Sequence, residues 1–426
     1  MSQVIRSSPS LSKPTALKRA AVAVLAAYAV IACAPTLSFA ADTATNAGST
    51  DPIRIGVIVP LTGGAASYGP GMANAAKALA EKINAQDGGL LNGRKIEIVI
   101  ADDESNPTAG VAAANKLIDV EHVVAIGGVW SSAVAMAIKP IAVQRGVALM
   151  VVGSGDETTE GDNHGLVWRF QARGSDWGGA FARTVLKDGA KKVSLLVLQS
   201  PYTISMVQPF IDGIKKGGGT VLDTVYYNPS QTSYRAEVDR VFSKNPDAVF
   251  VPAYLPDFSA IAKEVYRGGY KSKLYTISGA ADSEGQFAKN VGNAVAEGIS
   301  HVQSIPPTQS TAYQTFLSVT GTPKGTLSFF ASNVYDQIAV TALAIEKSKS
   351  TDASVFTKQF IGIANGPGKT VYDPVAGVKA IRQGETIRYS GAGSDFHFSP
   401  TGDQLNREYG HFVLRDGKSV LVDVVK

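Results

Sequence analysis

Apolar runs of strand length alternate with longer helical patterns along the first third of the chain. Strands that alternate with helices of ten or more residues favour parallel βαβ units. The expected strands are 54–60, 95–101, 123–127 and 147–152, and the expected helices are 72–84, 108–119 and 131–145.

The same alternation restarts after the junction near residues 170–176, which predicts a second unit of the same kind. The expected strands are 193–198, 221–227, 248–252 and 274–277, and the expected helices are 178–186, 206–215, 234–243 and 258–266.

The two units need connections that can bend. The junction 170–176 (FQARGSD) lacks periodicity and is one candidate hinge, and 300–307, which ends in Pro306-Pro307, is another. A helical stretch at 328–347 and a Gly-rich region of strands and turns follow. Two α/β units joined by more than one crossing would form a cleft that can close.

The segment 51–71, DPIRIGVIVPLTGGAASYGPG, joins a buried-type strand to a glycine-rich turn and an Ala-rich helix. A strand whose carboxyl end leads to a glycine loop and a helix start is a usual ligand position in open α/β sheets. The layout therefore indicates a small-molecule site at this edge.

The first forty residues have the pattern of a secretory signal peptide. Basic residues precede an apolar run at 20–34, and Pro35 and the small-residue sequence Ser38-Phe39-Ala40 follow. We expect cleavage after Ala40 or Ala41, and a flexible leader over 41–52. Cys33 leaves an alternative, because residues 30–33 (VIAC) resemble a lipoprotein box that would anchor the protein through this cysteine.

Removal of the signal changes both the charge and the cysteine inventory. The precursor has 40 basic and 36 acidic residues, and four of the basic residues lie in the signal. A nearly neutral mature chain gives no electrostatic reason to bind nucleic acid. Cys33 is the one cysteine, so ordinary cleavage excludes disulfides and thiolate catalysis.

The chain resembles the substrate-binding proteins of branched-chain amino-acid-type ABC importers, the leucine/isoleucine/valine-binding group. The resemblance spans about residues 53–412 and is carried by IGVIVPLTGGAASYG, AQDGGLLNGRKIEIVIADDESNP, GGVWSSAVAMAIKPIAVQRGVALMV, GAKKVSLLV and YDQIAVTALAIEKS.

The resemblance implies a type I periplasmic binding fold, α/β, with two Rossmann-like lobes of parallel sheets flanked by helices and joined by a three-strand hinge. Lobe 1 would comprise 53–172 and 307–405, and lobe 2 would comprise 173–303 and 408–426. The implied protein is a periplasmic monomer without a cofactor. It closes on a small ligand like a Venus flytrap and delivers that ligand to ABC permease subunits in the inner membrane.

Two polar turns follow expected strands of the first unit. Ser131 and Ser132 open a helix, so either they serve only as helix caps, or their hydroxyls and the helix N-terminus bind a carboxylate. Gly153, Ser154 and Gly155 form either a simple turn or a cradle of N–H groups. The resemblance implies the ligand role for Ser131 and for the 153–155 turn, although relatives often have a hydroxyl residue where this chain has Gly155.

Three tyrosines fall in expected turns: Tyr68, Tyr202 and Tyr254. Turn tyrosines are usually half-buried surface residues, but the resemblance implies that these line the cleft, where rings bury an apolar ligand body. Family members that hold an α-amino group use a glutamate after the strand equivalent to 274–277. Ala280 or its neighbour replaces that acid here, and Asp282 could substitute for it.

If Asp282 does not substitute, the ligand lacks a free α-amine, because a cation left without its carboxylate in a closed cleft would cost several kcal/mol. Trp130 would then favour an aromatic or aliphatic carboxylate, or an amide. It could equally fill the space left by an absent disulfide, whose two positions in relatives correspond to Ser105 and Trp130.

Enzyme signals are weak. Residues 363–370 end like a phosphate-binding loop but lack its first glycine, and 371–374 does not read as a helix start. The acids at 102–104 read as a solvated turn, the five histidines are scattered without metal-ligand spacing, and no G-x-S-x-G motif is present. We therefore expect a capture protein, with a receptor for a signalling partner or an exported hydrolase as alternatives.

Overall fold

The computed structural model describes residues 50–281 and 285–425. The expected signal peptide, its Cys33, most of the leader and Asp282 lie outside the described residues.

Sheet 1 is parallel, with strand order β2-β1-β3-β4-β5. Its strands are β1 (Ile53–Val59), β2 (Ile96–Asp102), β3 (Ala125–Val129), β4 (Ala148–Val151) and β5 (Val167–Arg169). The intervening helices are α1 (Gly69–Asp87), α2 (Pro107–Asp119) and α3 (Ser132–Gln144). The strands and helices expected in this part of the chain are confirmed, with ends that differ by a few residues.

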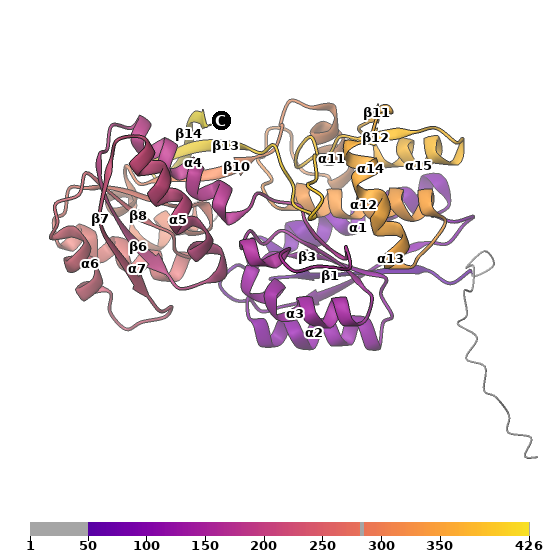
Figure 1. Ribbon diagram of the computed structural model, residues 1–426, viewed down its shortest axis with the longest axis horizontal. Coiled ribbons are helices and arrows are strands. Elements are labelled where there is room, and N and C mark those ends of the chain that lie inside the picture. Colours follow the sequence, from indigo (N-terminus) through magenta and orange to yellow (C-terminus); the bar gives the residue numbers. More distant parts are fainter. Residues whose placement is uncertain (1–49, 282–284, 426) are drawn as a thin grey trace, which may run out of the picture. The chain divides into compact units, whose positions relative to one another are not determined.

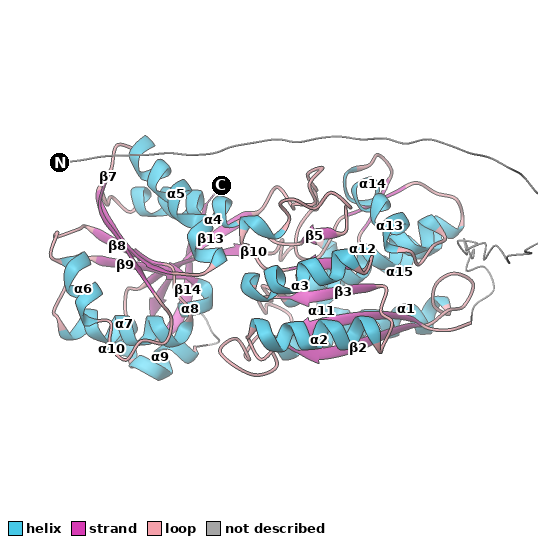
Figure 2. Cartoon of the chain, turned by 60° about the horizontal axis from the view of Figure 1, so that its bottom comes forward, coloured by secondary structure: helices cyan, strands magenta, loops and turns pink. Residues whose placement is uncertain are grey.

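The two faces of sheet 1 belong to different hydrophobic clusters because successive strand residues point to opposite sides. Ile53, Ile55 and Val57 pack in the cluster that contains α1, whereas Ile58 packs in the cluster that contains α2 and α3. Figure 2 shows α2 and α3 along this second face of the sheet. The face with α1 is completed by α12 (Ala331–Ser348), which lies beside α1 in Figure 1.

Sheet 2 has the order β14-β13-β10-β9-β8-β6-β7, and β13 and β14 are its antiparallel strands. Its strands are β6 (Lys192–Leu198), β7 (Thr220–Tyr227), β8 (Ala248–Val251), β9 (Lys273–Ile277), β10 (Ser300–Ile305), β13 (Glu408–Arg415) and β14 (Lys418–Val425). Its helices are α4 (Gly174–Lys187), α5 (Pro201–Lys216), α6 (Arg235–Phe242), α7 (Leu255–Arg267), α8 (Ser278–Ala281), α9 (Gln286–Val291) and α10 (Asn293–Ala296).

The expected hinge at 300–307 is partly wrong. Residues 300–305 form the buried strand β10, and α11 (Thr311–Thr320) then packs in the cluster of sheet 1. Among the described residues the chain passes between the two clusters near 170–173, 306–310 and 399–407.

The region after α12 is more helical than expected. It contains α13 (Ala353–Phe356), α14 (Phe360–Asn365) and α15 (Pro374–Arg382), beside a two-stranded sheet of β11 (Lys369–Val371) and β12 (Ile387–Tyr389). The expectation that 371–374 does not start a helix is wrong. Asp373 caps α15, accepting a hydrogen bond from the N–H of Val375 at 3.0 Å, and Pro374 takes the first helical position.

Candidate ligand-binding site

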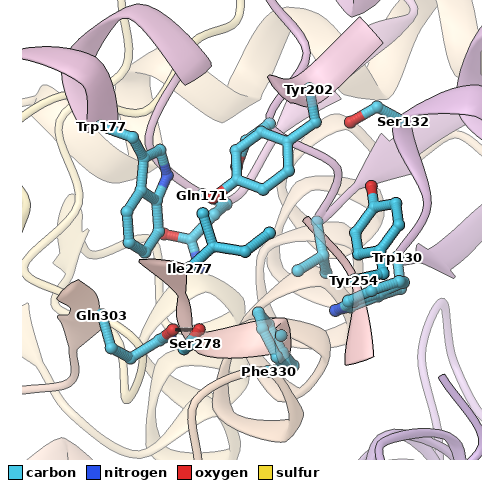
Figure 3. Close-up of a pocket in the computed structure, with 13 residues that line it drawn as sticks. Trp130, Ser132, Gln171, Trp177, Tyr202, Tyr254, Ile277, Ser278, Gln303 and Phe330 are labelled. Carbon is cyan, nitrogen blue, oxygen red and sulfur yellow. Dashed lines mark hydrogen bonds between the residues drawn. The ribbon is translucent and has the colours of Figure 1, made fainter. Parts of the chain in front are cut away.

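A cavity lies at the carboxyl ends of strands from both sheets, and its empty space, which includes the part open to solvent, amounts to about 400 Å³. Figure 3 shows the side chains that converge on it. The walls are Trp130, Ser132, Val152, Ser154, Gln171, Trp177, Tyr202, Tyr254, Ile277, Ser278, Gly279, Gln303 and Phe330. The site therefore draws on sheet 1, on sheet 2 and on the first passage between them.

Of the two serines at the start of α3, only Ser132 lines the cavity. Ser131 is the N-cap, and its hydroxyl accepts a hydrogen bond from the N–H of Val134 at 3.4 Å. Ser132 is buried, and its Oγ accepts from the N–H of Gly155 at 2.9 Å. Because this bond uses the oxygen as an acceptor, the hydroxyl hydrogen of Ser132 can point to a ligand.

The 153–155 turn does not offer the row of N–H groups expected from the sequence. The N–H of Gly153 donates to the Val129 carbonyl at 3.1 Å, and the N–H of Gly155 is taken by Ser132. Ser154 lines the cavity. The turn therefore contributes Ser154 to the cavity wall, while the backbone N–H groups of Gly153 and Gly155 are used in hydrogen bonds within the protein.

Close packing explains why Gly155 carries no hydroxyl side chain. A Cβ atom there would lie 3.1 Å from the Cβ of Ser132 and 3.3 Å from Pro201, which begins α5. A side chain at this position therefore requires Ser132 or Pro201 to move by a few tenths of an ångström. The glycine allows α3 and α5 to pack closely on either side of the turn.

Arg169 holds this turn in place, and the sequence patterns gave no indication of it. Its guanidinium is fully buried and donates from Nη1 to the Ser154 carbonyl at 2.7 Å and from Nη2 to the Asp156 carbonyl at 3.0 Å. Its Nε lies 3.1 Å from a carboxylate oxygen of Asp403, which belongs to the third passage between the clusters. The ion pair therefore ties the binding turn to that passage.

Aromatic side chains form one side of the cavity. Trp130 has its ring centroid 5.8 Å from that of Tyr254 and 5.9 Å from that of Phe330. Tyr68 does not line this cavity but stacks on Trp130 at 5.5 Å from the opposite side. Burial raises the pKa of Tyr254 to about 12 and the pKa of Tyr202 well above its ordinary value. Both phenols are therefore neutral donors at physiological pH.

Two hydrogen-bond donors in the cavity are buried and unpaired among the described residues. Gln171 and Trp177 have exposed fractions of 1% and 2%, and neither Gln171 Nε2 nor Trp177 Nε1 has a hydrogen-bond partner. The N–H of Ala172 donates to Gln171 Oε1 at 2.9 Å, which identifies the free end of the amide as the NH₂ group. Neither residue was a sequence candidate, although 170–176 was noted as a hinge.

The side of the cavity where relatives have a glutamate is formed by Ser278 and Gly279, and the Ser278 hydroxyl donates to Gln303 Oε1. Of the two alternatives expected there, Ala280 and its neighbour, Ala280 is wrong, because its side chain is fully buried in the core of sheet 2 and does not line the cavity, whereas Gly279 does. Asp282 lies outside the described residues, and the described cavity wall contains no charged side chain.

The acidic turn at 102–104 is only partly solvated, contrary to expectation. Asp102 accepts hydrogen bonds from the N–H groups of Leu61 and Thr62, whereas Asp103 is fully buried and burial raises its pKa to about 6. Within residues 50–281 and 285–425 no His, Cys, Asp and Glu side chains cluster in a way suited to a metal ion. No helix in this part of the chain has the length and apolar composition needed to cross a membrane.

Residues 52–418 match the profile of the periplasmic binding protein family. The chain belongs to this family. A curated relative of this periplasmic binding protein is Leu/Ile/Val-binding protein homolog 3 of Brucella melitensis biotype 1, which is 25% identical over 90% of this chain and 97% of its own length.

Solved structures of the same architecture confirm the fold of this periplasmic binding protein as a type I α/β fold with parallel-sheet lobes flanked by helices. The leucine-binding protein LivK of Thermotoga maritima MSB8 has a TM-score of 0.73 and 22% identity, covering 88% of this chain and 98% of its own. A solute-binding protein of R. palustris in complex with benzoate has a TM-score of 0.69 and 18% identity, covering 88% of this chain and 96% of its own.

Proposed function

We propose that this periplasmic binding protein captures a small molecule that has a carboxylate or amide group, an apolar body and no free α-amine, and delivers it to an ABC importer. The ligand would occupy the cavity between the two sheets. Trp130, Ser132, Ser154, Tyr202 and Tyr254 would contact it, as the sequence predicted, together with Gln171 and Trp177.

The observation that carries this proposal is the pair of buried, unpaired donors at Gln171 Nε2 and Trp177 Nε1. A buried donor without an acceptor costs roughly 1–3 kcal/mol. A carboxylate or carbonyl oxygen that accepts hydrogen bonds from both groups would remove this cost for each of them. A ligand with such an oxygen is therefore favoured in this position.

The described part of the cavity wall argues against an ammonium group, and Asp282, the acid considered for this role, lies outside it. A cation in such an enclosed space costs several kcal/mol unless partner groups compensate it, and a carboxylate is the strongest such partner. The described wall offers neutral amides, hydroxyls and aromatic rings. A curated relative is named for leucine, isoleucine and valine, and a structural neighbour was solved in complex with benzoate, so both ligand classes occur among similar proteins.

The lobe boundaries that we propose are 53–172 with 307–405, and 173–303 with 408–426. They agree with the separation of the hydrophobic clusters, since Phe396 and Phe398 pack with sheet 1 whereas Tyr409 and Leu414 pack with sheet 2. Closure of the lobes would exclude water from the polar contacts and present a distinct surface to a permease. We infer that the chain is not an enzyme and that it acts outside the cytoplasm.

A thermal-shift screen of the refolded, ligand-free mature protein tests the proposal. Each amine-free acid or amide is paired with its α-amino counterpart, such as 3-phenylpropionate with phenylalanine and 4-methylvalerate with leucine. A ligand at a hundred times its Kd adds about 2.7 kcal/mol to the free energy of unfolding. We expect stabilisation by the amine-free members, and stabilisation by the amino acids alone would contradict the proposal.

A further inference from the structure

A second cavity lies on the other side of the aromatic wall. Its empty space amounts to about 1120 Å³ and is partly open to solvent, compared with about 400 Å³ for the first cavity. Tyr68 and Gly71, at the start of α1, form one side of it, and Phe412 and Ser419, from β13 and β14, form another. Like the first cavity, it is bounded by elements of both sheets.

The two cavities share one wall residue, Phe330. Its ring meets Tyr68 edge-on at 4.9 Å and Trp130 edge-on at 5.9 Å. The Phe330 backbone is fixed, because its carbonyl accepts hydrogen bonds from Asn333 and Val334 at the start of α12. The side chain is only half-buried and sits at the lower edge of the first cavity in Figure 3. A path between the cavities through this shared wall requires the Phe330 ring to rotate about its side-chain torsions.

The second cavity has the chemistry of a site for an uncharged, mostly apolar group. Aromatic rings and aliphatic groups alternate with Ser and Thr hydroxyls around it, and the part of the chain that the structure describes contributes no charged side chain to its wall. Such a mixture favours aryl or alkyl groups with few polar substituents. The donors of Gln171 and Trp177 lie in the first cavity. If a ligand carboxylate binds to them, the rest of an elongated ligand reaches the second cavity only past the shared residue Phe330.

We propose that the two cavities form one extended site, in which Phe330 is the movable divider and the second cavity takes the distal part of an elongated aryl carboxylate or its amide. The inference rests on the function proposed above. It adds that the protein discriminates by ligand length, so that biphenyl-4-carboxylate exploits a space that benzoate leaves empty.

The test fills the second cavity and leaves the first untouched. Gly71→Leu places a branched side chain in it, and the substitution is tolerable at Cβ because the nearest atom, the Cβ of Ala331, would be 3.8 Å away. Isothermal titration of the mature protein with biphenyl-4-carboxylate should show a loss of roughly tenfold or more in affinity, the scale on which apolar pockets discriminate by size. Benzoate affinity should stay unchanged.

Gly64→Leu is the matched control, because a Cβ at Gly64 meets nothing within 4 Å and the residue lines neither cavity. It should leave both affinities as they are. Thr326→Trp, on an exposed part of the second cavity wall, repeats the test if Gly71→Leu does not fold.

Equal affinities of the substituted and unsubstituted proteins for biphenyl-4-carboxylate, or an equal loss for both acids, would overturn the extended site while leaving the proposed function intact. If neither acid binds the unsubstituted protein, the extended site for aryl carboxylates is overturned, whereas the proposed function is decided by the thermal-shift screen.

Discussion

Replacing Gln171 by glutamate reverses one of the two contacts on which the proposed function depends. The new side chain has the same shape and can still accept the hydrogen bond from the N–H of Ala172, which Gln171 Oε1 accepts at 2.9 Å. The free NH₂ group, however, becomes a carboxylate oxygen. A ligand carboxylate then meets an acceptor where it met a donor.

The expected loss follows from two contributions. A hydrogen bond to a charged acceptor contributes roughly 1.5–3 kcal/mol, and its removal corresponds to about a 10- to 150-fold loss of affinity. Repulsion between two carboxylates about 4 Å apart could add up to about 4 kcal/mol at an effective dielectric constant of 20. Protonation of the introduced glutamate relieves part of this repulsion, so the loss should grow as the pH rises.

Isothermal titration with benzoate and benzamide provides the assay and an internal control. The amide can donate its own N–H to the new carboxylate, so Gln171→Glu should shift the preference from acid to amide. Gln199→Glu, an exposed position outside the cavity, controls for the added charge. Unchanged benzoate affinity in Gln171→Glu would refute the assignment of Gln171 as a head-group donor.

Other predictions concern the supports of the site. Gly155→Ala should destabilise the protein by roughly 1–3 kcal/mol through overpacking against Pro201, and should weaken ligand binding, as measured by urea unfolding and titration. Asp403→Asn should cost roughly 3 kcal/mol in urea unfolding, because it leaves the buried Arg169 cation with only the more distant carboxylate of Asp156, 4.0 Å away; a loss below about 1 kcal/mol would show that the Arg169–Asp403 pair is not structural. Burial lowers the pKa of His301 from 6.5 to about 3, so the folded state keeps it neutral while the unfolded state binds a proton. Its contribution to stability is therefore present above pH 6.5 and is lost as the pH falls toward 3, by up to about 1.4 kcal/mol per pH unit. The variant His301→Gln should flatten this acid limb, and an unaltered limb would contradict the assignment.

Periodicity predicted the βαβ elements well because their apolar positions repeat at strand or helix spacing. It missed β10, whose sequence SHVQSI has few apolar residues. Two of its buried polar side chains have tertiary partners: His301 Nε2 lies 2.7 Å from Ser419 Oγ, and Gln303 accepts from Ser278. Ser304 Oγ is buried without a hydrogen-bond partner among the described residues. The short helices after α12 were not predicted for a related reason: isolated helices of this length are only marginally stable without tertiary packing.

The sequence and its family resemblance pointed to Trp130, Tyr202 and Tyr254, which line the cavity, but they also pointed to Tyr68, which does not, and they missed Phe330. The resemblance favoured Ser131 over Ser132 as the carboxylate contact, whereas the Ser131 hydroxyl caps α3 and Ser132 lines the cavity and accepts from Gly155. Gln171 and Trp177 were inaccessible to pattern reasoning. These residues stand out because Gln171 Nε2 and Trp177 Nε1 lack hydrogen-bond acceptors among the described residues, and this can be seen only in the packed structure.

The indole N–H signals in a ¹H–¹⁵N spectrum test the central claim most directly. The chain has three tryptophans, and Trp168 Nε1 already donates to the Gly165 carbonyl at 2.9 Å, so it serves as an internal reference. Trp177→Phe assigns the signal of Trp177. Titration of the ligand-free protein with an amine-free acid should move the Trp177 indole proton downfield, as expected for a new hydrogen bond to an oxygen, while the Trp168 signal stays in place. A Trp177 signal that does not move at saturating ligand would contradict the account.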